Sequence, residues 1–155
     1  ALDNTRPCID TSGNFHVKTD IFDVHDYEQN VAMFKNNYDK LMETGELYDR
    51  FDHIQKYTKG QPTFVSEYGG IKWSLSNVDN SWGYGNAPKT EKEFIERYKG
   101  LTEALLNNDQ MLGLCYTQLY DVEQEQNGLY TYSRKPKFET SIFRAINSRK
   151  AKIEL

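Results

Sequence analysis

Short apolar runs of strand length alternate along this chain with longer stretches in which apolar side chains recur at helical spacing. The short runs predict four strands, over residues 6–10, 19–25, 63–66 and 111–118. The spaced positions predict one or two helices within 28–57, one helix after Thr90 and a last helix over about 140–148. This order is typical of βα units around a parallel sheet, so we expect an α/β fold of four βα units.

Two local signals follow the third predicted strand. The segment 71–90 is rich in Ser, Asn, Gly and Trp. It is too long for a routine connection, so we expect it to be either functional or mobile. At its end, Thr90 and Glu93 have the spacing of a capping box, which predicts that a helix begins there.

The length of 155 residues suits a single domain. A complete eight-stranded (βα) barrel takes typically about 250 residues, so four βα units correspond to about half of one. We find no internal repeat, low-complexity tract or Pro/Gly-rich linker. We therefore treat residues 1–155 as one unit and expect it to be part of a longer protein.

The net charge of −4, with Lys and Arg scattered along the chain, gives no sign of a nucleic-acid partner. We interpret the cluster of Arg134, Lys135 and Lys137 as a solvated basic patch. No apolar run approaches the roughly 20 residues needed to cross a bilayer, and residues 1–7 lack the pattern of an export signal. We expect a soluble chain without a membrane partner, and the compartment stays open.

The sequence indicates neither a metal site nor a disulfide framework. Cys8 and Cys115 both lie inside short apolar stretches, which predicts buried free thiols. The three histidines show neither HExxH spacing nor a CxxC partner. The acidic segment 121–128 lacks the alternation of a calcium loop, so we interpret it as a solvated loop. We expect no metal and no cofactor.

In a parallel sheet of this kind, catalytic groups lie at the carboxyl ends of the strands and in the loops that follow. Polar and aromatic residues leave all four predicted strands at these ends. They are Asp10, Ser12, His25, Asp26, Tyr27, Glu67, Tyr68, Tyr116, Thr117 and Gln118.

Glu67 is the strongest candidate among them, because it ends an apolar run and is followed closely by Gly69 and Gly70. The glycines permit a sharp turn and would leave room for a ligand above the carboxylate. Such a carboxylate suits the nucleophile of a retaining glycosidase, which also needs a second carboxylate about 5–5.5 Å away. The alternative is an ordinary capping or ion-paired glutamate.

Two residues of the neighbouring predicted strand are candidates to hold Glu67. His25 and Tyr27 could donate hydrogen bonds that keep the carboxylate ionised and oriented. The alternative for this segment is a partly buried strand whose histidine is satisfied by a backbone carbonyl.

Aromatic residues make up 14% of the chain, which suits the stacking of sugar rings and also suits an ordinary core. The long segment 71–90 contains Trp73, Trp82 and Tyr84. Packing is favoured for Trp73. Trp82 is the better candidate for stacking on a sugar, because Ser81 and Gly83 flank it.

Four blocks of the sequence occur in the order found in glycoside hydrolase family two, and the chain resembles this family over nearly its whole length. The blocks are DNTRPCID (3–10), TDIFDVHDYEQ (19–29), PTFVSEYGG (62–70) and LGLCYTQLYDVEQEQNGLYTYSRKPKF (112–138). The resemblance implies strands five to eight of a (βα)8 barrel, with Glu67 of the SEYGG block as the nucleophile. It also implies that Tyr27 lies near the nucleophile and that Tyr116 lies where many members place a tryptophan under the sugar.

The same resemblance implies a retaining exo-β-glycosidase of the β-galactosidase type. The acid/base glutamate of this family follows an asparagine at the end of the fourth barrel strand, and no Asn-Glu pair occurs in this sequence. We therefore expect the isolated chain to be inactive. Glucuronidases of the family hold the sugar carboxylate with an Asn-x-Lys-Gly segment, whereas residues 125–128 here are EQNG, which favours a neutral β-galactoside as the carbohydrate substrate.

A function from another class stays open, namely a non-catalytic carbohydrate-binding or interaction module derived from such a barrel. In either case, half a barrel leaves two strand edges and an apolar face uncovered. We therefore expect the isolated chain to self-associate.

Overall fold

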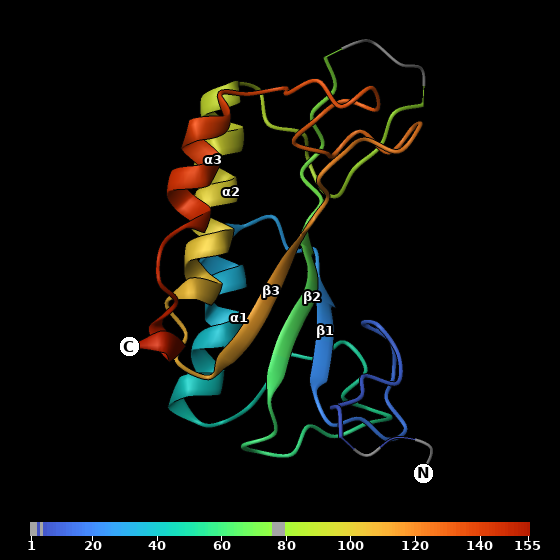
Figure 1. Cartoon of the computed structure of the whole chain (residues 1–155), viewed down its shortest axis with the longest axis vertical. Helices are drawn as coiled ribbons and strands as arrows, with labels where there is room; N and C mark the ends of the chain where they lie inside the picture. Colours follow the sequence, from blue (N-terminus) through green and yellow to red (C-terminus); the bar gives the residue numbers. More distant parts are fainter. Residues whose placement is uncertain (1–2, 4, 76–79) are drawn as a thin grey trace.

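The computed structural model describes residues 3, 5–75 and 80–155, and its strands and helices alternate along the chain (Figure 1). The elements in order are β1 (Phe22–Asp26), α1 (Val31–Glu43), β2 (Thr63–Gly69), α2 (Glu91–Leu106), β3 (Met111–Thr117) and α3 (Thr140–Asn147), followed by a short 3-10 helix at Lys152–Glu154. The α/β class is therefore as predicted. The described residues form three parallel strands and three α-helices rather than four βα units.

Strands β1, β2 and β3 lie side by side in chain order and run parallel. The three helices lie together on one face of this sheet (Figure 1). The register pairs Val24 with Val65, and an irregularity after Val24 then brings His25 opposite Glu67. One residue of β2, Ser66, is accommodated at this irregularity. This shift decides which side chain of β1 lies beside Glu67.

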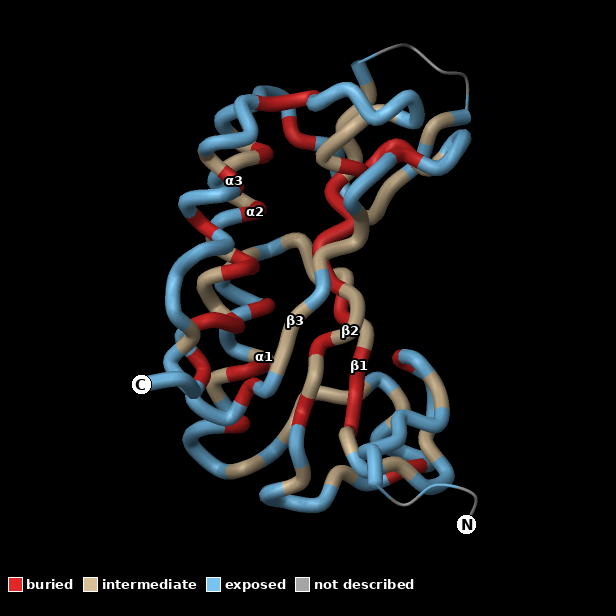
Figure 2. The backbone as a smooth tube through the Cα atoms, in the orientation of Figure 1, coloured by how far each residue is buried: buried red, intermediate tan, exposed pale blue. Residues whose placement is uncertain are grey.

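The core lies between the sheet and the helices (Figure 2). Val65 and Tyr68 of β2 are fully buried. The Tyr68 ring contacts Phe34 of α1, and its hydroxyl lies 2.8 Å from the Thr102 hydroxyl of α2. Burying each large apolar side chain contributes about 1.5–3 kcal/mol, so the helices hold β2 firmly from one side.

The second helix begins where its cap residue predicts. The Thr90 hydroxyl accepts a hydrogen bond from the Glu93 N–H at 3.1 Å, and α2 starts at the next residue after Thr90. The Glu93 carboxylate accepts from the Lys89 N–H rather than from the N–H of Thr90. The expected reciprocal contact is therefore displaced by one residue. Asn30 caps α1 with its side-chain oxygen in the same manner.

Residues 6–10 do not form the predicted strand. Their polar groups form hydrogen bonds with residues 17–20 instead. The Cys8 carbonyl accepts from the Asp20 N–H at 2.8 Å. The Asp10 carboxylate accepts from the Val17 N–H at 2.7 Å. A side chain that binds neighbouring backbone groups competes with a β-ladder, so this segment folds as a loop against the start of β1.

One helix, not two, lies in the interval 28–57, and residues 44–57 form turns and irregular segments after α1. Gly45 adopts a φ of +76° directly after the helix end, a conformation that favours glycine. The Asp49 carboxylate then accepts from the Phe51 N–H at 2.8 Å, which builds a local turn. These turn signals outweigh the helical spacing of the apolar positions.

The loops that follow β2 and β3 pack against each other beyond the carboxyl ends of the strands (Figure 1). The Trp82 N–H donates to the Gln124 carbonyl, and the Gln126 N–H donates to the Trp82 carbonyl, each at 2.9 Å. The segment 71–90, predicted to be functional or mobile, is thus tied to the loop after β3. Its part at 76–79 lies outside the described residues.

Lys137 and Asp121 overturn two expectations about these loops. The Lys137 ammonium is buried and donates to the Asp121 carboxylate at 2.5 Å and to the Trp73 carbonyl at 2.6 Å. The solvated basic patch is therefore wrong for Lys137, although Arg134 and Lys135 are exposed. The solvated loop is wrong for Asp121, because long-range pairing of opposite charges allows both groups to be buried.

The prediction of buried thiols is also wrong, because Cys8 and Cys115 are both free and exposed. Cys8 lies in the loop that replaced the first predicted strand. Cys115 lies on β3, an edge strand that has a single strand neighbour among the described residues. An apolar sequence context predicts burial only where another element covers the side chain, and no described element covers the face of β3 that carries Cys115.

In the described ranges, no helix is long and apolar enough to cross a membrane.

Candidate functional site

Glu67 lies within β2, near the carboxyl end of the sheet. Its neighbour Tyr68 points into the helix-facing core, so Glu67 projects to the other side of the strand. The Glu67 side chain is 38% exposed. The strand continues as far as Gly69, so Glu67 precedes the strand end by two residues. A half-exposed carboxylate on the open face of a parallel sheet can meet a ligand.

The glycines after Glu67 make room for protein side chains, and room for a ligand above the carboxylate stays a prediction. Gly69 and Gly70 have φ values of +84° and +58°. A Cβ on Gly69 would lie 2.2 Å from the Tyr116 ring, and a Cβ on Gly70 would lie 2.4 Å from the Tyr84 ring. The two glycines therefore allow aromatic rings to pack closely against the strand end.

The two oxygens of Glu67 have different surroundings. Oε2 accepts a short hydrogen bond from the Tyr27 hydroxyl, and the His25 Nδ1 lies 3.3 Å from the same oxygen. Oε1 has no hydrogen-bond partner within the described residues. Oε2 thus has a hydrogen bond from Tyr27 and a close imidazole nitrogen, whereas Oε1 has neither among the described residues. The structure brings both predicted neighbours, His25 and Tyr27, to Glu67. The contact with His25 is an ion pair only if His25 is protonated.

Tyr27 is fixed by stacking as well as by its hydroxyl. Its ring lies parallel to the Tyr84 ring, with centroids 3.5 Å apart and an interplanar angle of 5°. Burial, together with the hydrogen bond to Glu67, raises the pKa of the Tyr27 hydroxyl above its usual value near 10. The hydroxyl therefore keeps its proton at neutral pH and can donate to Glu67.

A polar network centred on the buried Asp23 lies next to Glu67. Asp23 of β1 is buried, and its Oδ2 accepts from the Ser66 hydroxyl and from the Gly13 N–H. The His16 ring lies between Asp10 and Asp23, with its Nδ1 at 2.6 Å from Asp10 Oδ1 and its Nε2 at 3.1 Å from Asp23 Oδ1. Ser66 directly precedes Glu67, so the network is continuous with the site.

The charges of this network act on His16. Burial lowers the pKa of His16, but hydrogen bonding to Asp10 and Asp23 outweighs burial and raises that pKa overall. The Asp10 pKa is lowered, first by its hydrogen bond with His16. Sequence reasoning missed His16, Asp23 and Ser66. They lie in a loop and inside strands, and no spacing signal marks them.

The other aromatic candidates have different places. Trp73 packs against Phe94 and Phe138, as predicted. Trp82 is 45% exposed and meets the edge of Tyr84 at a centroid distance of 5.9 Å, so it remains available for a sugar ring. Its role in stacking stays a prediction.

The structure does not bring Tyr116 to the Glu67 side chain. Its ring packs between Tyr68 of β2 and Tyr98 of α2, at centroid distances of 5.6 and 4.7 Å. Its hydroxyl contacts the Asn127 carbonyl at 3.4 Å. Tyr116 is partly buried against the helix-facing core, and its role under a sugar stays a prediction.

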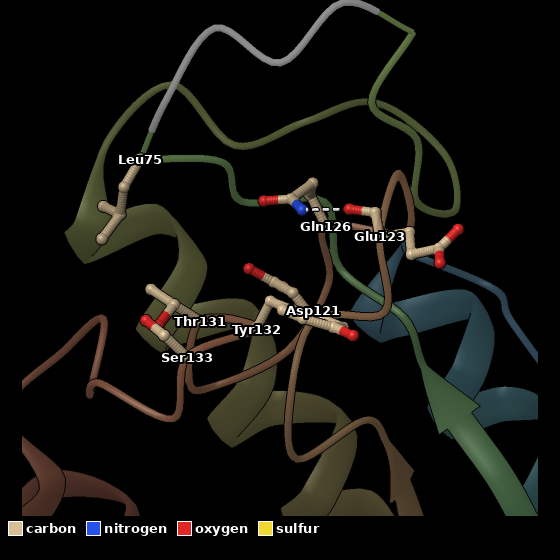
Figure 3. Close-up of a pocket in the computed structure, with 7 residues that line it drawn as sticks. All are labelled: Leu75, Asp121, Glu123, Gln126, Thr131, Tyr132 and Ser133. Atoms are coloured by element: carbon tan, nitrogen blue, oxygen red, sulfur yellow. Dashed lines mark hydrogen bonds between the residues drawn. The ribbon is translucent and has the colours of Figure 1, made fainter.

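A separate hollow lies among the loops after β2 and β3 (Figure 3). It has a volume of about 560 Å³ and is lined by Leu75, Asp121, Glu123, Gln126, Thr131, Tyr132 and Ser133. None of the predicted site residues lines it. In the part of the chain that the structure describes, no group of three or more His, Cys, Asp or Glu side chains could hold a metal ion.

No family model and no curated protein matches this sequence. Solved structures do match its fold. An exo-β-agarase matches with a TM-score of 0.56 at 14% identity, over 84% of this chain and 16% of the agarase. A β-glucuronidase from Faecalibacterium prausnitzii matches with a TM-score of 0.56 at 14% identity, over 86% of this chain and 22% of that protein.

A β-galacturonidase from Eisenbergiella tayi, described as a member of glycoside hydrolase family two, matches with a TM-score of 0.59 at 14% identity. The match covers 86% of this chain and 24% of that protein. This chain thus spans less than a quarter of the length of each of these three structures. At such identities, the likeness shows that the chain shares its fold with a part of these glycosidases.

Proposed function

We propose that this chain is the second half of the (βα)8 catalytic barrel of a retaining exo-β-glycosidase, and that Glu67 is its nucleophile. The observation that carries the proposal is the carboxylate of Glu67, whose Oε2 accepts from Tyr27 and lies 3.3 Å from His25 Nδ1, while Oε1 has no hydrogen-bond partner among the described residues. Strands in chain order with helices on one face agree with an arc of such a barrel. The fold shared with parts of three glycosidases supports it further.

The geometry suits attack by Oε1 on an anomeric carbon. A bond forms between Oε1 and that carbon while the bond to the leaving oxygen breaks, and the electron pair departs with the leaving oxygen. The hydrogen bond from Tyr27 and the nearby His25 ring orient the other oxygen, so the carboxylate does not need to reorient during attack. Water then cleaves the glycosyl ester and restores Glu67.

We place the acid/base carboxylate of this reaction in the first half of the barrel, outside this chain. General acid catalysis contributes about 10²–10⁴-fold, so the 155-residue chain is inactive on ordinary glycosides in this proposal. A neutral β-galactoside is the proposed substrate class. Two of the similar proteins are named for uronic acids. In this chain, however, the Lys137 ammonium pairs with the buried Asp121 carboxylate, so in this proposal it does not bind the carboxylate of a sugar.

The test uses a sugar that needs no general acid. A 2,4-dinitrophenyl 2-deoxy-2-fluoro-β-galactoside carries a leaving group that departs without a proton, and its fluorine slows hydrolysis of the glycosyl ester. We expect slow addition of one fluoro-galactosyl group to the 155-residue chain, located on Glu67 by peptide mass spectrometry. The longer protein that contains the chain should be labelled faster at the same residue.

The matched control is Glu67→Gln, which should abolish labelling while the far-UV circular dichroism stays unchanged. Asp26→Asn, a change of a buried carboxyl group on β1, tests whether labelling is selective. Labelling of the longer protein at a carboxylate other than Glu67 would sink the assignment. Sugar binding without any labelling would instead favour a non-catalytic carbohydrate-binding module.

We also propose that the isolated chain self-associates through its uncovered sheet. Strands β1 and β3 each have one strand neighbour among the described residues, so each presents an unpaired edge. The large side chain of Leu112 on β3 is 51% exposed. Light scattering should therefore show dimers or larger species, and a monodisperse monomer would contradict this proposal.

A further inference from the structure

The His25 ring is held between two polar groups that come from different segments. Its Nε2 lies 3.1 Å from the Ser12 hydroxyl oxygen, and its Nδ1 lies 3.3 Å from Glu67 Oε2. The His25 side chain is 13% exposed. A neutral imidazole carries one N–H and one lone pair. The chemistry of the two neighbours therefore decides which nitrogen bears the proton.

Glu67 and Ser12 place different demands on the ring. An ionised carboxylate only accepts hydrogen bonds, so a lone pair on Nδ1 would face the negative charge of Glu67. A proton on Nδ1 removes this repulsion and provides a second donor to Oε2. A serine hydroxyl can donate as well as accept, so Ser12 can supply the proton that the lone pair of Nε2 requires.

The turn that carries Ser12 is fixed by its neighbour Gly13. Gly13 is buried, its N–H donates to Asp23 Oδ2 at 2.8 Å, and its carbonyl accepts from Arg50 at 3.1 Å. Its φ is +56°, and a Cβ at this position would lie 1.9 Å from the His25 ring. A glycine is therefore required for the turn to rest directly against the imidazole.

We propose that Ser12 is a positioning residue, which holds neutral His25 in the Nδ1–H tautomer so that His25 donates to Oε2 of Glu67. The catalytic consequence rests on the proposed function: with Oε2 held on two sides, Oε1 is the oxygen that attacks. The tautomer itself follows from the two contacts and does not depend on any reaction.

The direct test is imidazole ¹⁵N NMR of the 155-residue chain at pH 7.5. The chain has three histidines, so the spectrum is simple, and His25→Gln identifies the signals of His25. We expect a protonated Nδ1 and an unprotonated Nε2. Ser12→Ala should shift His25 toward the Nε2–H form, Ser12→Thr should restore the Nδ1–H form, and Thr11→Ala should leave the spectrum unchanged. Ser12 is exposed, so we expect the two Ser12 variants to keep the fold.

Three results would overturn the inference: a Nε2–H tautomer in the parent chain, a doubly protonated His25 at this pH, or a spectrum that is the same in Ser12→Ala. A second readout is the rate at which the fluoro-galactoside labels Glu67. Loss of one hydrogen bond is worth about 0.5–1.5 kcal/mol, so Ser12→Ala should slow labelling by up to about tenfold, and Ser12→Thr should recover it.

The two proposals fail separately. An Nδ1–H tautomer that depends on Ser12, with no labelling of Glu67, would reject the nucleophile and leave the positioning role of Ser12 standing. Labelling of Glu67 in a chain whose His25 has another tautomer would support the nucleophile and reject the positioning role of Ser12.

Discussion

Glu67 and Asp121 are both carboxylates near the carboxyl end of the sheet, yet their surroundings differ in every respect. The Asp121 side chain is 2% exposed and is bound by the Lys137 ammonium and the Gly128 N–H. The Glu67 side chain is 38% exposed; its Oε2 accepts a hydrogen bond from Tyr27 and lies 3.3 Å from His25 Nδ1. The first carboxylate is neutralised by a cation, and the second is oriented at one oxygen while the other has no hydrogen-bond partner among the residues that the structure describes.

The difference teaches how a carboxylate is kept reactive. A buried ion pair satisfies the charge and removes it from solvent, which stabilises an arrangement but leaves nothing to attack a ligand. A neutral donor such as the Tyr27 hydroxyl fixes the direction of the group without cancelling its charge. By this criterion the surroundings of Glu67 agree with its proposed role as a nucleophile, whereas Asp121 joins the loops after β2 and β3.

The largest expected effect comes from replacing each carboxylate by its amide. Asp121→Asn leaves the Lys137 ammonium buried without its partner, and burial already lowers the pKa of Lys137 while Asp121 raises it. We expect a loss of about 3–5 kcal/mol in the free energy of unfolding. Glu67→Gln should cost less than about 1 kcal/mol, because its side chain is partly exposed. Urea unfolding measures both.

Lys135→Met provides the control for this comparison, because Lys135 is exposed and its removal should change stability by no more than about 0.5 kcal/mol. Equal costs for the two amide substitutions would show that Asp121 and Glu67 are held in the same way, and the distinction between them would be lost.

A second prediction concerns the turn behind Glu67. Gly13→Ala combines a positive φ with a Cβ 1.9 Å from the His25 ring, whereas Gly60→Ala has a φ of +88° and open space. We expect about 1–2 kcal/mol of destabilisation at Gly60 from the backbone alone. At Gly13 the clash adds about 1–3 kcal/mol. Thermal or urea unfolding of the two variants isolates the contribution of the contact with His25.

The Gly13 variant should also move the imidazole ¹⁵N signals of His25, and the Gly60 variant should not. An equal loss in the free energy of unfolding for both glycine variants would show that the turn at Gly13 can move away from His25.

A third and smaller effect is a pH dependence of stability from His16. Its pKa is raised above the unfolded value of 6.5, so its contribution is complete below that value and is lost as the pH rises through the folded pKa. The Asp10 pKa is lowered from 3.8, so its contribution is present above that value and is lost as the pH falls. The pair therefore stabilises most between about pH 4 and 6.5.

The loss of a hydrogen bond between charged groups costs about 1.5–3 kcal/mol, so His16→Gln should narrow the stability difference between pH 5.5 and pH 8.5. Urea midpoints at the two pH values measure it, and His53→Gln is the matched control at a histidine outside the network. A His16 variant with the same pH profile as the parent chain would exclude this source of pH dependence.

Local signals in the sequence predicted the elements that depend on a few neighbouring residues. The cap at Thr90 placed the start of α2, and the apolar run from Thr63 placed the start of β2. The candidates His25, Tyr27 and Glu67 were found because polar residues at the carboxyl ends of parallel strands converge. Their contact required the register irregularity after Val24, which no sequence pattern indicates.

The alternation of short and long apolar patterns determined the α/β class, the three observed strands and the carboxylate on β2, because these follow from periodicity and from turn residues close in the chain. The tertiary structure alone decided that Lys137 is buried with a partner 16 residues away, that Cys115 is exposed and that Tyr116 enters the core. Burial depends on what covers a residue, and the covering groups come from distant parts of the chain. For the same reason, the different surroundings of the two Glu67 oxygens arise only from the packing of β1, β2 and the turn at Ser12.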